Sequence, residues 1–287
     1  MPKLREGSEA ASVLLTSDSL EEWTEAYNSY DRSVGRLSEE KGRAGLVEMD
    51  RWWRMDLPAS LRSRGAEPYL TKEELVNVVK WKMWIGVVRP NLLRFANETD
   101  PGKVKTKSRE AFRHLPRPRP LPLSPSPSEV AQVAHENKAD ETAGAGDTER
   151  VTSAATKKAV NALTSELKGI GPATASAILA ALSGGCPFDA DEVIDAVMKT
   201  GVRKYSLPEY LEVQAALAEK AESLGNPWDA ERVRKAIWSR AMHARFNLDP
   251  PAEHSETRQS AEGSERLPRR KSAGGGGSVS KRQKSRR

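Results

Sequence analysis

The stretch LKGIGPATASAILA, residues 167–180, restricts the fold of this chain more than any other part of its sequence. Apolar residues before it recur at helical spacing, and Gly169 and Gly171 then interrupt that pattern. Pro172 follows where a new helix can begin, because the first turn of a helix does not need the N–H that proline lacks. We therefore expect two helices joined by a tight glycine turn.

A turn of this kind can bind an anion. Glycine has no Cβ, so a Gly-x-Gly step can present backbone N–H groups, and the positive end of the second helix dipole adds to their effect. A phosphodiester oxygen is the obvious biological anion. The residues that we expect to contact DNA phosphate are Lys168, Gly169, Ile170, Gly171, Ala173 and Thr174. The alternative is an ordinary helical hairpin, for which a single glycine at the end of the first helix would be enough.

Further residues point to a known family. The hairpin is similar to the helix-hairpin-helix motif of DNA repair proteins, in particular that of the HhH-GPD DNA glycosylase superfamily. Together with the segment 81–90, the PF-x-x-DE sequence at 187–192 and an AIWS helix around Trp238, it resembles a divergent eukaryotic branch of that superfamily. The resemblance covers about 71–246 without an insertion. It implies an all-α HhH-GPD-like fold and double-stranded, including damaged, DNA as partner.

The resemblance also suggests a catalytic residue. Superfamily enzymes have an aspartate at the start of the helix after the hairpin, and Asp191 follows Gly171 at a similar spacing. Cleavage of an N-glycosidic bond develops positive charge on the sugar, which a nearby carboxylate can stabilise while it orients the attacking water. Asp189 and Asp191 are also suited to cap the helix or to occupy its first turn. The sequence leaves both roles open for Asp191.

Two absences narrow the chemistry that the resemblance implies. Bifunctional members carry a lysine two residues after the second hairpin glycine, whose amine forms a Schiff base with the sugar, but this chain has Ala173 there. Its single cysteine, Cys186, excludes a four-cysteine Fe–S cluster, and its four histidines are scattered, so we expect neither a metal nor a cofactor. The expectation is either a monofunctional DNA glycosylase without lyase activity or a non-catalytic relative.

The segment WKMWIGVVRP, residues 81–90, is a second candidate for DNA contact. Lys82 and Arg89 interrupt an apolar helix and its end, so we expect them at a DNA surface or pocket, and the alternative is a solvated face without a ligand. Trp81 and Trp84 are better explained as core residues, although stacking on an unpaired base is an alternative. The sequence around the segment carries more Lys and Arg than Asp and Glu, which favours a local basic surface.

Composition divides the chain into ordered and disordered parts. No strand-like alternation is visible, so the expected fold class is all-α. Residues 19–115 and 153–248 are predicted to form one helical domain, with a disordered Pro-rich and acidic insertion at 116–152. Residues 1–18 are expected to be a disordered N-terminus and residues 249–287 a disordered basic tail.

Charge indicates the compartment and the partners. The formal net charge is +6, yet residues 266–287 alone hold nine Lys or Arg and no Asp or Glu, which leaves −3 for the rest. A nucleic-acid surface on the body must therefore be a local patch. The basic tail predicts a nuclear protein, otherwise a cytoplasmic one, and no apolar run is long enough for a membrane span. The function classes that remain are a base-excising DNA-binding hydrolase, a non-catalytic DNA-binding protein and a protein-interaction scaffold, each expected as a monomer.

Overall fold

Capping side chains mark where several helices begin in the computed structural model of the chain. Ser19 and Asp100 each accept a hydrogen bond from the backbone N–H three residues further on. Thr71 and Glu74 exchange reciprocal bonds in a capping box, as their spacing predicts. These bonds give partners to N–H groups that have none inside a helix, so the sequence determines helix starts locally.

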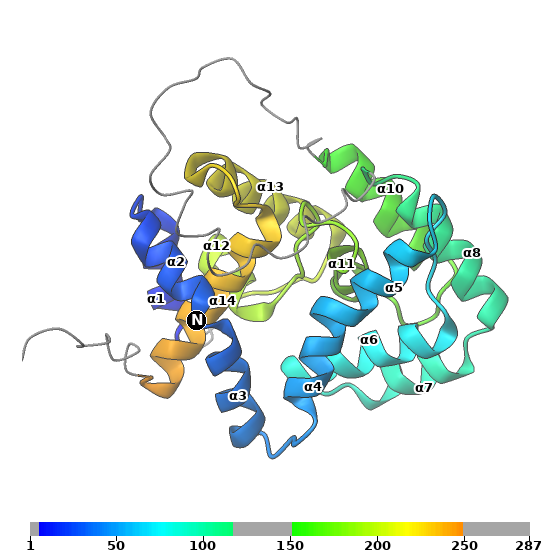
Figure 1. Cartoon of the computed structure of the whole chain (residues 1–287), viewed down its shortest axis with the longest axis horizontal. Coiled ribbons are helices and arrows are strands. Elements are labelled where there is room, and N and C mark those ends of the chain that lie inside the picture. The colour runs from blue at the N-terminus through cyan, green and yellow to red at the C-terminus, as the bar shows by residue number, and fades with distance from the viewer. Residues whose placement is uncertain (1–5, 117–150, 249–287) are drawn as a thin grey trace, which may run out of the picture. The chain divides into compact units, whose positions relative to one another are not determined.

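The structure describes residues 6–116 and 151–248, and nearly all of its regular elements are α-helices (Figure 1). Before the gap lie α1 (Ser8–Thr16), α2 (Leu20–Asn28), α3 (Tyr30–Glu40), α4 (Leu46–Arg51), the π-helix η1 (Trp52–Asp56), α5 (Leu57–Ser63), α6 (Lys72–Ile85), α7 (Pro90–Glu98) and α8 (Pro101–Phe112). After it lie α10 (Ser153–Thr164), α11 (Pro172–Ala180), α12 (Asp191–Met198), α13 (Leu207–Leu224) and α14 (Ala230–Phe246). No strand occurs in the described part of the chain, which confirms the predicted all-α class.

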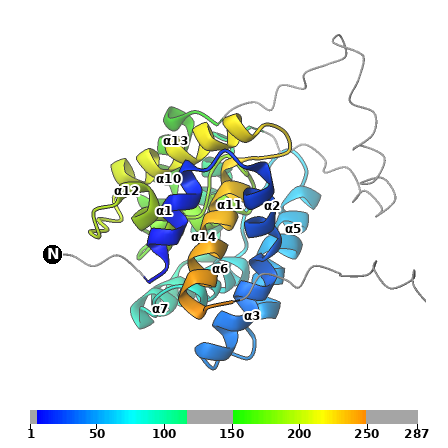
Figure 2. The same ribbon diagram turned by 90° about the vertical axis from the view of Figure 1, so that its left-hand side faces the viewer.

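Two helices organise the packing of the others. Helices α1, α2, α3, α12 and α13 contact α14, which Figure 2 shows among them. Helices α4, α7, α8 and α11 contact α6. Helix α11 also contacts α10 and α13, so the second helix of the predicted hairpin joins the two groups. The residues on either side of the gap pack together as well, because α10 lies against α8.

Aromatic side chains fill the core behind the hairpin. The indole of Trp53 stacks on that of Trp81, with ring centroids 3.7 Å apart and an interplanar angle of 9°. Phe188 packs against Trp81 at 4.9 Å between centroids, and Trp53 Nε1 donates to the carbonyl of Ala177 in α11 at 3.0 Å. Trp81 is fully buried, so it belongs to the core, while Trp84 is half-buried. This cluster fixes α6, α11 and the loop before α12 relative to one another.

The prediction of a disordered N-terminus up to residue 18 is wrong for its described part. Residues 8–16 form α1, whose Ala11 and Leu14 are buried against α12 and α14. The hydroxyl of Ser12 also donates to the carbonyl of Ala196 in α12 at 3.0 Å. A nine-residue helix is marginal alone, so tertiary packing stabilises this one, and sequence periodicity could not reveal that.

Most of the other predicted disordered segments lie outside the described residues. Of the insertion at 116–152, the structure describes only residues 116, 151 and 152, and it describes none of 249–287. Thr152 accepts a hydrogen bond from the N–H of Ala155 and so caps α10. No helix within the described ranges is long and apolar enough to cross a membrane.

Candidate functional site

The two glycines of the hairpin have different structural roles. Gly169 has a φ of +80°, and a Cβ there would come within 2.7 Å of Phe95 Cδ2 on α7. Gly171 has a φ of −96° and caps α11, and a Cβ there would meet no atom within 4 Å. The turn and the packing of α7 therefore require Gly169. Nothing in the described chain requires Gly171, which leaves its backbone open to close approach from outside.

Not every predicted amide of the hairpin is available to an anion. The N–H of Ile170 donates to the carbonyl of Leu167 at 3.0 Å, and that of Thr174 donates to the carbonyl of Gly171 at 2.9 Å. The turn and the first bonds of α11 already use these two amides, so the phosphate contact of Ile170 and Thr174 stays a prediction that their backbone N–H groups do not support. The amides of Gly169, Gly171 and Ala173 donate to no backbone carbonyl in the described part of the chain.

A pocket of about 280 Å³ lies on one side of the hairpin. Seven of the predicted site residues line it, from three separate segments of the chain: Lys82, Arg89, Gly169, Gly171, Ala173, Thr174 and Asp191. Aromatic side chains of Phe188, Tyr205 and Trp238 also line it. The structure thus brings the basic segment after α6, the hairpin and the start of α12 to one cavity.

The other two predicted residues, Lys168 and Ile170, line a second cavity at the turn. A groove of about 440 Å³ follows residues 164–171, and Gly169 and Gly171 line both this groove and the pocket. Lys168 is exposed there, with its ammonium 4.5 Å from the centroid of the Phe95 ring. The side chain of Ile170 is 6% exposed and belongs to the core. The glycine turn therefore lines both the groove and the pocket.

Asp191 is the first residue of α12, and Ala190 holds the N-cap position without a side-chain bond. Asp191 is therefore not the N-cap, although its charge favours the positive end of the helix dipole. Its Oδ1 accepts a hydrogen bond from the Tyr205 hydroxyl at 3.1 Å, and the residue is half-exposed in the pocket. The carboxylate is thus fixed in direction while a bound molecule can still reach it.

Asp189 is the pocket residue whose importance sequence reasoning missed. It is 3% exposed, and neither carboxyl oxygen has a hydrogen-bond partner among the described residues. Burial raises the pKa of Asp189 to about 7, the charges of Glu209 and Asp191 act in the same direction, and Lys82 opposes them. The sequence does place this acid directly after the apolar Phe188, a position where burial could have been expected.

Hydrogen bonds to the backbone hold the loop that carries Asp189. Ser176 Oγ accepts from the N–H of Asp189, and Glu231 Oε2 accepts from the N–H of Phe188, both at 3.0 Å. Glu231 in turn pairs with Arg234, whose guanidinium is fully buried. The loop is therefore positioned by its backbone, and the Asp189 carboxyl is not needed for that purpose.

Lys82 extends from α6 into the same pocket. Burial lowers the pKa of its amine, the charges of Asp191 and Asp189 raise it, and that of Arg89 lowers it. Lys82 makes no ion pair within 4.0 Å with any described residue. It therefore acts on both carboxyl groups through space and keeps its donors available to a bound molecule.

Tyr205 covers the pocket from the loop between α12 and α13. Its backbone has a φ of +51°, a strained conformation for an aromatic residue, and its N–H donates to Glu209 Oε1 at 2.8 Å. The guanidinium of Arg89 lies 5.2 Å from the centroid of the Tyr205 ring. The strained backbone thus directs the ring beneath Arg89 and the hydroxyl toward Asp191.

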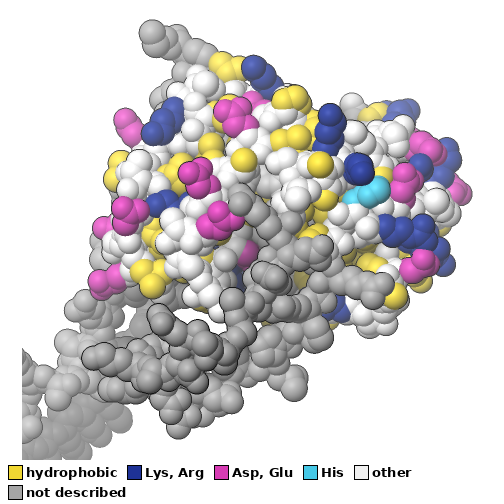
Figure 3. Space-filling view, turned by 90° about the horizontal axis from the view of Figure 1, so that it is seen from above, with side chains coloured by type: hydrophobic (Ala, Val, Ile, Leu, Met, Phe, Trp, Pro, Cys, Tyr) yellow, Lys and Arg dark blue, Asp and Glu magenta, His cyan; other side chains and the backbone are white. Residues whose placement is uncertain are grey.

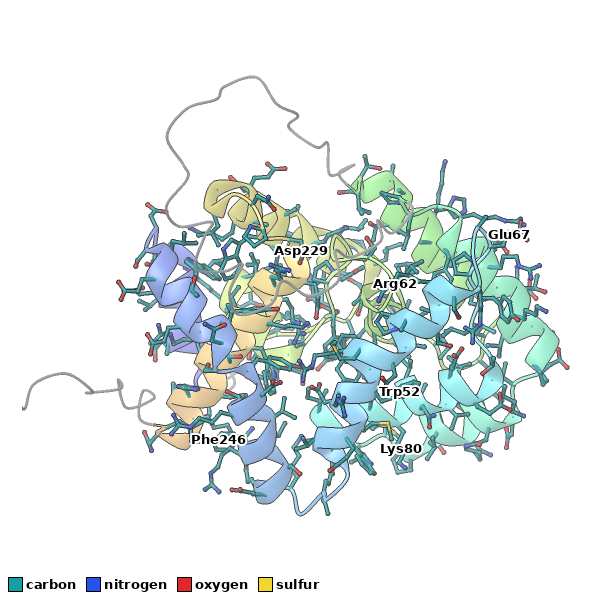
Figure 4. All side chains as sticks on the ribbon, in the orientation of Figure 1. Trp52, Arg62, Glu67, Lys80, Asp229 and Phe246 are labelled. Carbon is teal, nitrogen blue, oxygen red and sulfur yellow. The ribbon has the colours of Figure 1, made fainter. Side chains whose placement is uncertain are left out.

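Cations without acidic partners gather around the hairpin. Arg89, Arg94 and Lys168 contact aromatic rings but form no ion pair with a described residue. On α8, by contrast, Lys107 pairs with Glu110 and Glu166. Arg109 of the same helix and Arg113, its C-cap residue, both pair with Glu67, which Figure 4 labels. On the face that Figure 3 shows, basic side chains are interspersed with acidic ones.

The groove at the hairpin can hold an anion, and the pocket can hold a planar, partly polar group. The pocket offers carboxyl groups as acid, base or hydrogen-bond acceptor, an amine as donor, and aromatic rings for stacking. Within the described ranges, no group of His, Cys, Asp and Glu side chains is arranged to hold a metal ion. Comparison of the chain with family models, curated proteins and solved structures finds no match.

Proposed function

We propose that this chain binds double-stranded DNA at the helix hairpin and hydrolyses the bond between a base and its sugar in the adjoining pocket. The observation that carries the proposal is the position of Asp191. Its carboxylate lies in a pocket whose wall, the turn with Gly169 and Gly171, also lines an outer groove. A phosphate bound at this turn would therefore lie beside residues that also line the pocket, and we propose that the attached sugar and base reach Asp191 there.

Backbone amides and unpaired cations would hold the DNA strand. The amides of Gly169, Gly171 and Ala173 have no backbone acceptor, and they lie at or next to the N-terminus of α11, the positive end of its dipole. Lys168 lies beside them, and Arg89 lines the pocket. Such contacts position the phosphates without reading the sequence of bases.

The pocket would receive a base turned out of the duplex. A nucleobase is flat and has polar edges, which suits a cavity with Phe188, Tyr205 and Trp238 in its walls and carboxyl and amine groups between them. Turning a base out costs a few kcal/mol, least for a damaged or mismatched pair. Weakened pairs are therefore the substrates that we expect.

Asp191 would carry the chemistry at the sugar. The sugar gains positive charge as the base leaves, and the Asp191 carboxylate stabilises that charge and orients the attacking water. The Tyr205 hydroxyl keeps the carboxylate in place. Ala173 has no amine, so that position supports no Schiff base and the strand stays uncut by that route.

The proposal also includes the compartment. The basic segment 266–287 has the composition of a nuclear localisation signal, and we propose that the protein acts on nuclear DNA as a monomer. The alternative is a nuclear DNA-binding or scaffold protein in which Asp191 only begins α12. Two observations favour this alternative: Asp191 is the first residue of α12, and its carboxylate is already bonded to the Tyr205 hydroxyl.

A panel of duplexes with damaged or mismatched bases tests the proposal. Wild-type protein should release one class of base, and Asp191→Asn should lower the rate by orders of magnitude without weakening DNA binding, because it removes the charge that stabilises the sugar. Asp56→Asn is the matched control, since Asp56 is exposed and its side chain does not cap α5. No release from any duplex, with an Asp191→Asn variant that only loses about 1 kcal/mol of stability, would favour the non-catalytic alternative.

A further inference from the structure

The carboxyl of Asp189 is a buried acid that the fold does not use. Its backbone N–H is bonded to Ser176, but both carboxyl oxygens are buried without a partner among the described residues, and Asp189 is one of the residues that line the pocket. Leaving a buried polar group unpaired is costly, so proteins rarely keep one without a reason. A molecule bound in the pocket that Asp189 lines can supply the missing partner.

Groups from three helices face this carboxyl. Lys82 comes from α6, Asp191 from α12, and Glu209 and Tyr210 from α13. Burial, Glu209 and Asp191 all favour the protonated acid, and only Lys82 favours the carboxylate. The pKa of Asp189 is about 7, so near neutral pH the group holds a proton and can release it.

We propose that Asp189 is the general acid of the pocket and gives its proton to the base as it leaves the sugar. This inference rests on the proposed function. Asp189 and Asp191 then have separate roles, as carboxyl pairs do in glycoside hydrolysis, where environment keeps one group protonated and the other ionised.

The proton balance of the step is complete without a further reactant. The bond between the sugar carbon and the base nitrogen breaks, and its electron pair goes to the base. The base takes the proton of Asp189 on a ring nitrogen or carbonyl oxygen and leaves as a neutral molecule. Water adds to the sugar carbon and gives a proton to the Asp191 carboxylate. After product release, Asp191 loses this proton to solvent and Asp189 regains one from solvent, so both groups return to their starting states.

Lys82 is suited to support this step. It makes no ion pair with a described residue, yet its charge acts on both Asp189 and Asp191. When Asp189 gives up its proton it becomes a buried carboxylate, and the Lys82 ammonium stabilises that new charge. Lys82 thus acts on the step through its charge on Asp189, whereas in our proposal Asp189 gives its proton directly to the leaving base.

The assignment specifies a substrate class. A base that is neutral in DNA leaves as an anion unless an acid protonates it, so the pocket is built for neutral bases with an acceptor atom on the edge that faces Asp189. A base that already carries a positive charge leaves as a neutral molecule and gains nothing from Asp189. The two kinds of base therefore separate the role of Asp189 from that of Asp191, which both kinds require.

The test measures single-turnover excision by the full chain on two kinds of duplex. One set contains the neutral bases hypoxanthine, uracil and mismatched adenine, and the other contains 7-methylguanine, which is positively charged. Asp189→Asn should slow release of a neutral base by about a hundredfold and change release of 7-methylguanine by no more than a few fold. For the wild type, release of a neutral base should fall as pH rises above 7, and this fall should vanish in Asp189→Asn. Asp191→Asn should slow both kinds.

Each other outcome is decisive. Equal slowing of both kinds by Asp189→Asn means that the residue only shapes the pocket, and the proposed function stands without the acid. If the wild type releases only 7-methylguanine, the assignment of Asp189 as general acid is also rejected. If the wild type releases only neutral bases, the pH profile decides, and an unchanged fall above pH 7 in Asp189→Asn rejects the assignment. If the wild type releases no base from any duplex, both the assignment of Asp189 and the proposed function are rejected.

A measurement without DNA keeps the two proposals distinguishable. In the full chain labelled with ¹³C at the aspartate carboxyl groups, the signal absent from Asp189→Asn should titrate near pH 7. Lys82→Met should move that midpoint upward, because it removes the charge that favours the carboxylate. Lys158→Met, at an exposed position of α10, should leave it unchanged. A midpoint near pH 4 would overturn the assignment whatever the DNA assays give.

Discussion

The phenol of Tyr205 donates a hydrogen bond to Oδ1 of Asp191 at 3.1 Å, across the loop between α12 and α13. The contact depends on a left-handed backbone at Tyr205, with a φ of +51°. Strain of this kind costs about 1–3 kcal/mol and persists where the surrounding structure imposes it. Glu209 imposes it here, because its carboxylate accepts from the N–H groups of both Lys204 and Tyr205. The protein thus maintains a strained residue at the edge of its pocket.

Tyr205→Phe should slow base release without loss of fold. The variant keeps the ring beneath Arg89 but removes the bond to the Asp191 carboxylate, and a bond to a charged group contributes about 1.5–3 kcal/mol. We expect the single-turnover rate to fall by about tenfold or more, with DNA affinity unchanged. Tyr205→Ala, which also removes the ring, should lower both the single-turnover rate and the DNA affinity. An unaltered rate in Tyr205→Phe would mean that Asp191 needs no orientation.

The two hairpin glycines should respond in opposite ways to substitution. Gly171→Val places its side chain where no described atom lies within 4 Å, so we expect an unchanged melting temperature but weaker DNA binding by a chain without residues 266–287. Gly169→Ala should instead destabilise the fold by about 1–2 kcal/mol from its left-handed backbone, with the Phe95 contact in addition. Fluorescence anisotropy and thermal melts measure the two effects. Full affinity in a folded Gly171→Val protein would remove the turn from the DNA surface.

Asp189→Asn should stabilise the protein more at pH 8 than at pH 5. The pKa of Asp189 is raised from 3.8 to about 7 by burial, so in this window the unfolded chain loses its proton while the folded one keeps it. Wild-type stability therefore falls as pH rises from about 4 to about 7, by no more than about 4 kcal/mol for this group. Asparagine does not titrate, so its advantage should grow over that range and then level off. Urea unfolding at several pH values gives the comparison, and a constant difference would contradict it.

Deletion of residues 266–287 should affect location and salt dependence rather than the fold. It removes nine positive charges and no apolar residues beyond Leu267, Pro268, Ala273 and Val279. We expect loss of nuclear accumulation and a shallower dependence of non-specific DNA binding on salt, because fewer counterions are released. A large decrease in melting temperature would show that this segment packs on the rest of the chain.

Local rules account for what the sequence predicted correctly. Thr71 and Glu74 form a capping box because the two bonds lie within one turn, and Pro172 begins α11 because its ring suits the first helical position. Gly169 takes a left-handed conformation in the tight turn before α11, as a glycine there allows. These features depend on residues that are close in the chain, so the starts of these helices and the hairpin could be predicted from the sequence.

Features that depend on distant residues were missed. Asp189 was considered only as a helix cap, because its burial depends on α6, α11 and α13, which no local pattern describes. The amides of Ile170 and Thr174 donate to carbonyl groups of the turn, which the sequence pattern does not reveal. Lys82 and Arg89 were expected at a pocket, and the structure brings both to the cavity of Asp191, yet only the fold reveals that this is one cavity.

The position of α1 has a consequence for synthesis of the protein. Gly7 lies so close to α14 that a Cβ there would come within 2.0 Å of the carbonyl oxygen of Ala241, and α1 also packs on the helix that begins with Asp191. Helix α1 leaves the ribosome before α14 does, so it has to wait for α14 before it can bury Ala11 and Leu14. Folding of this unit is therefore completed only after translation of residue 246 or beyond, and until then its N-terminal apolar residues are open to chaperones.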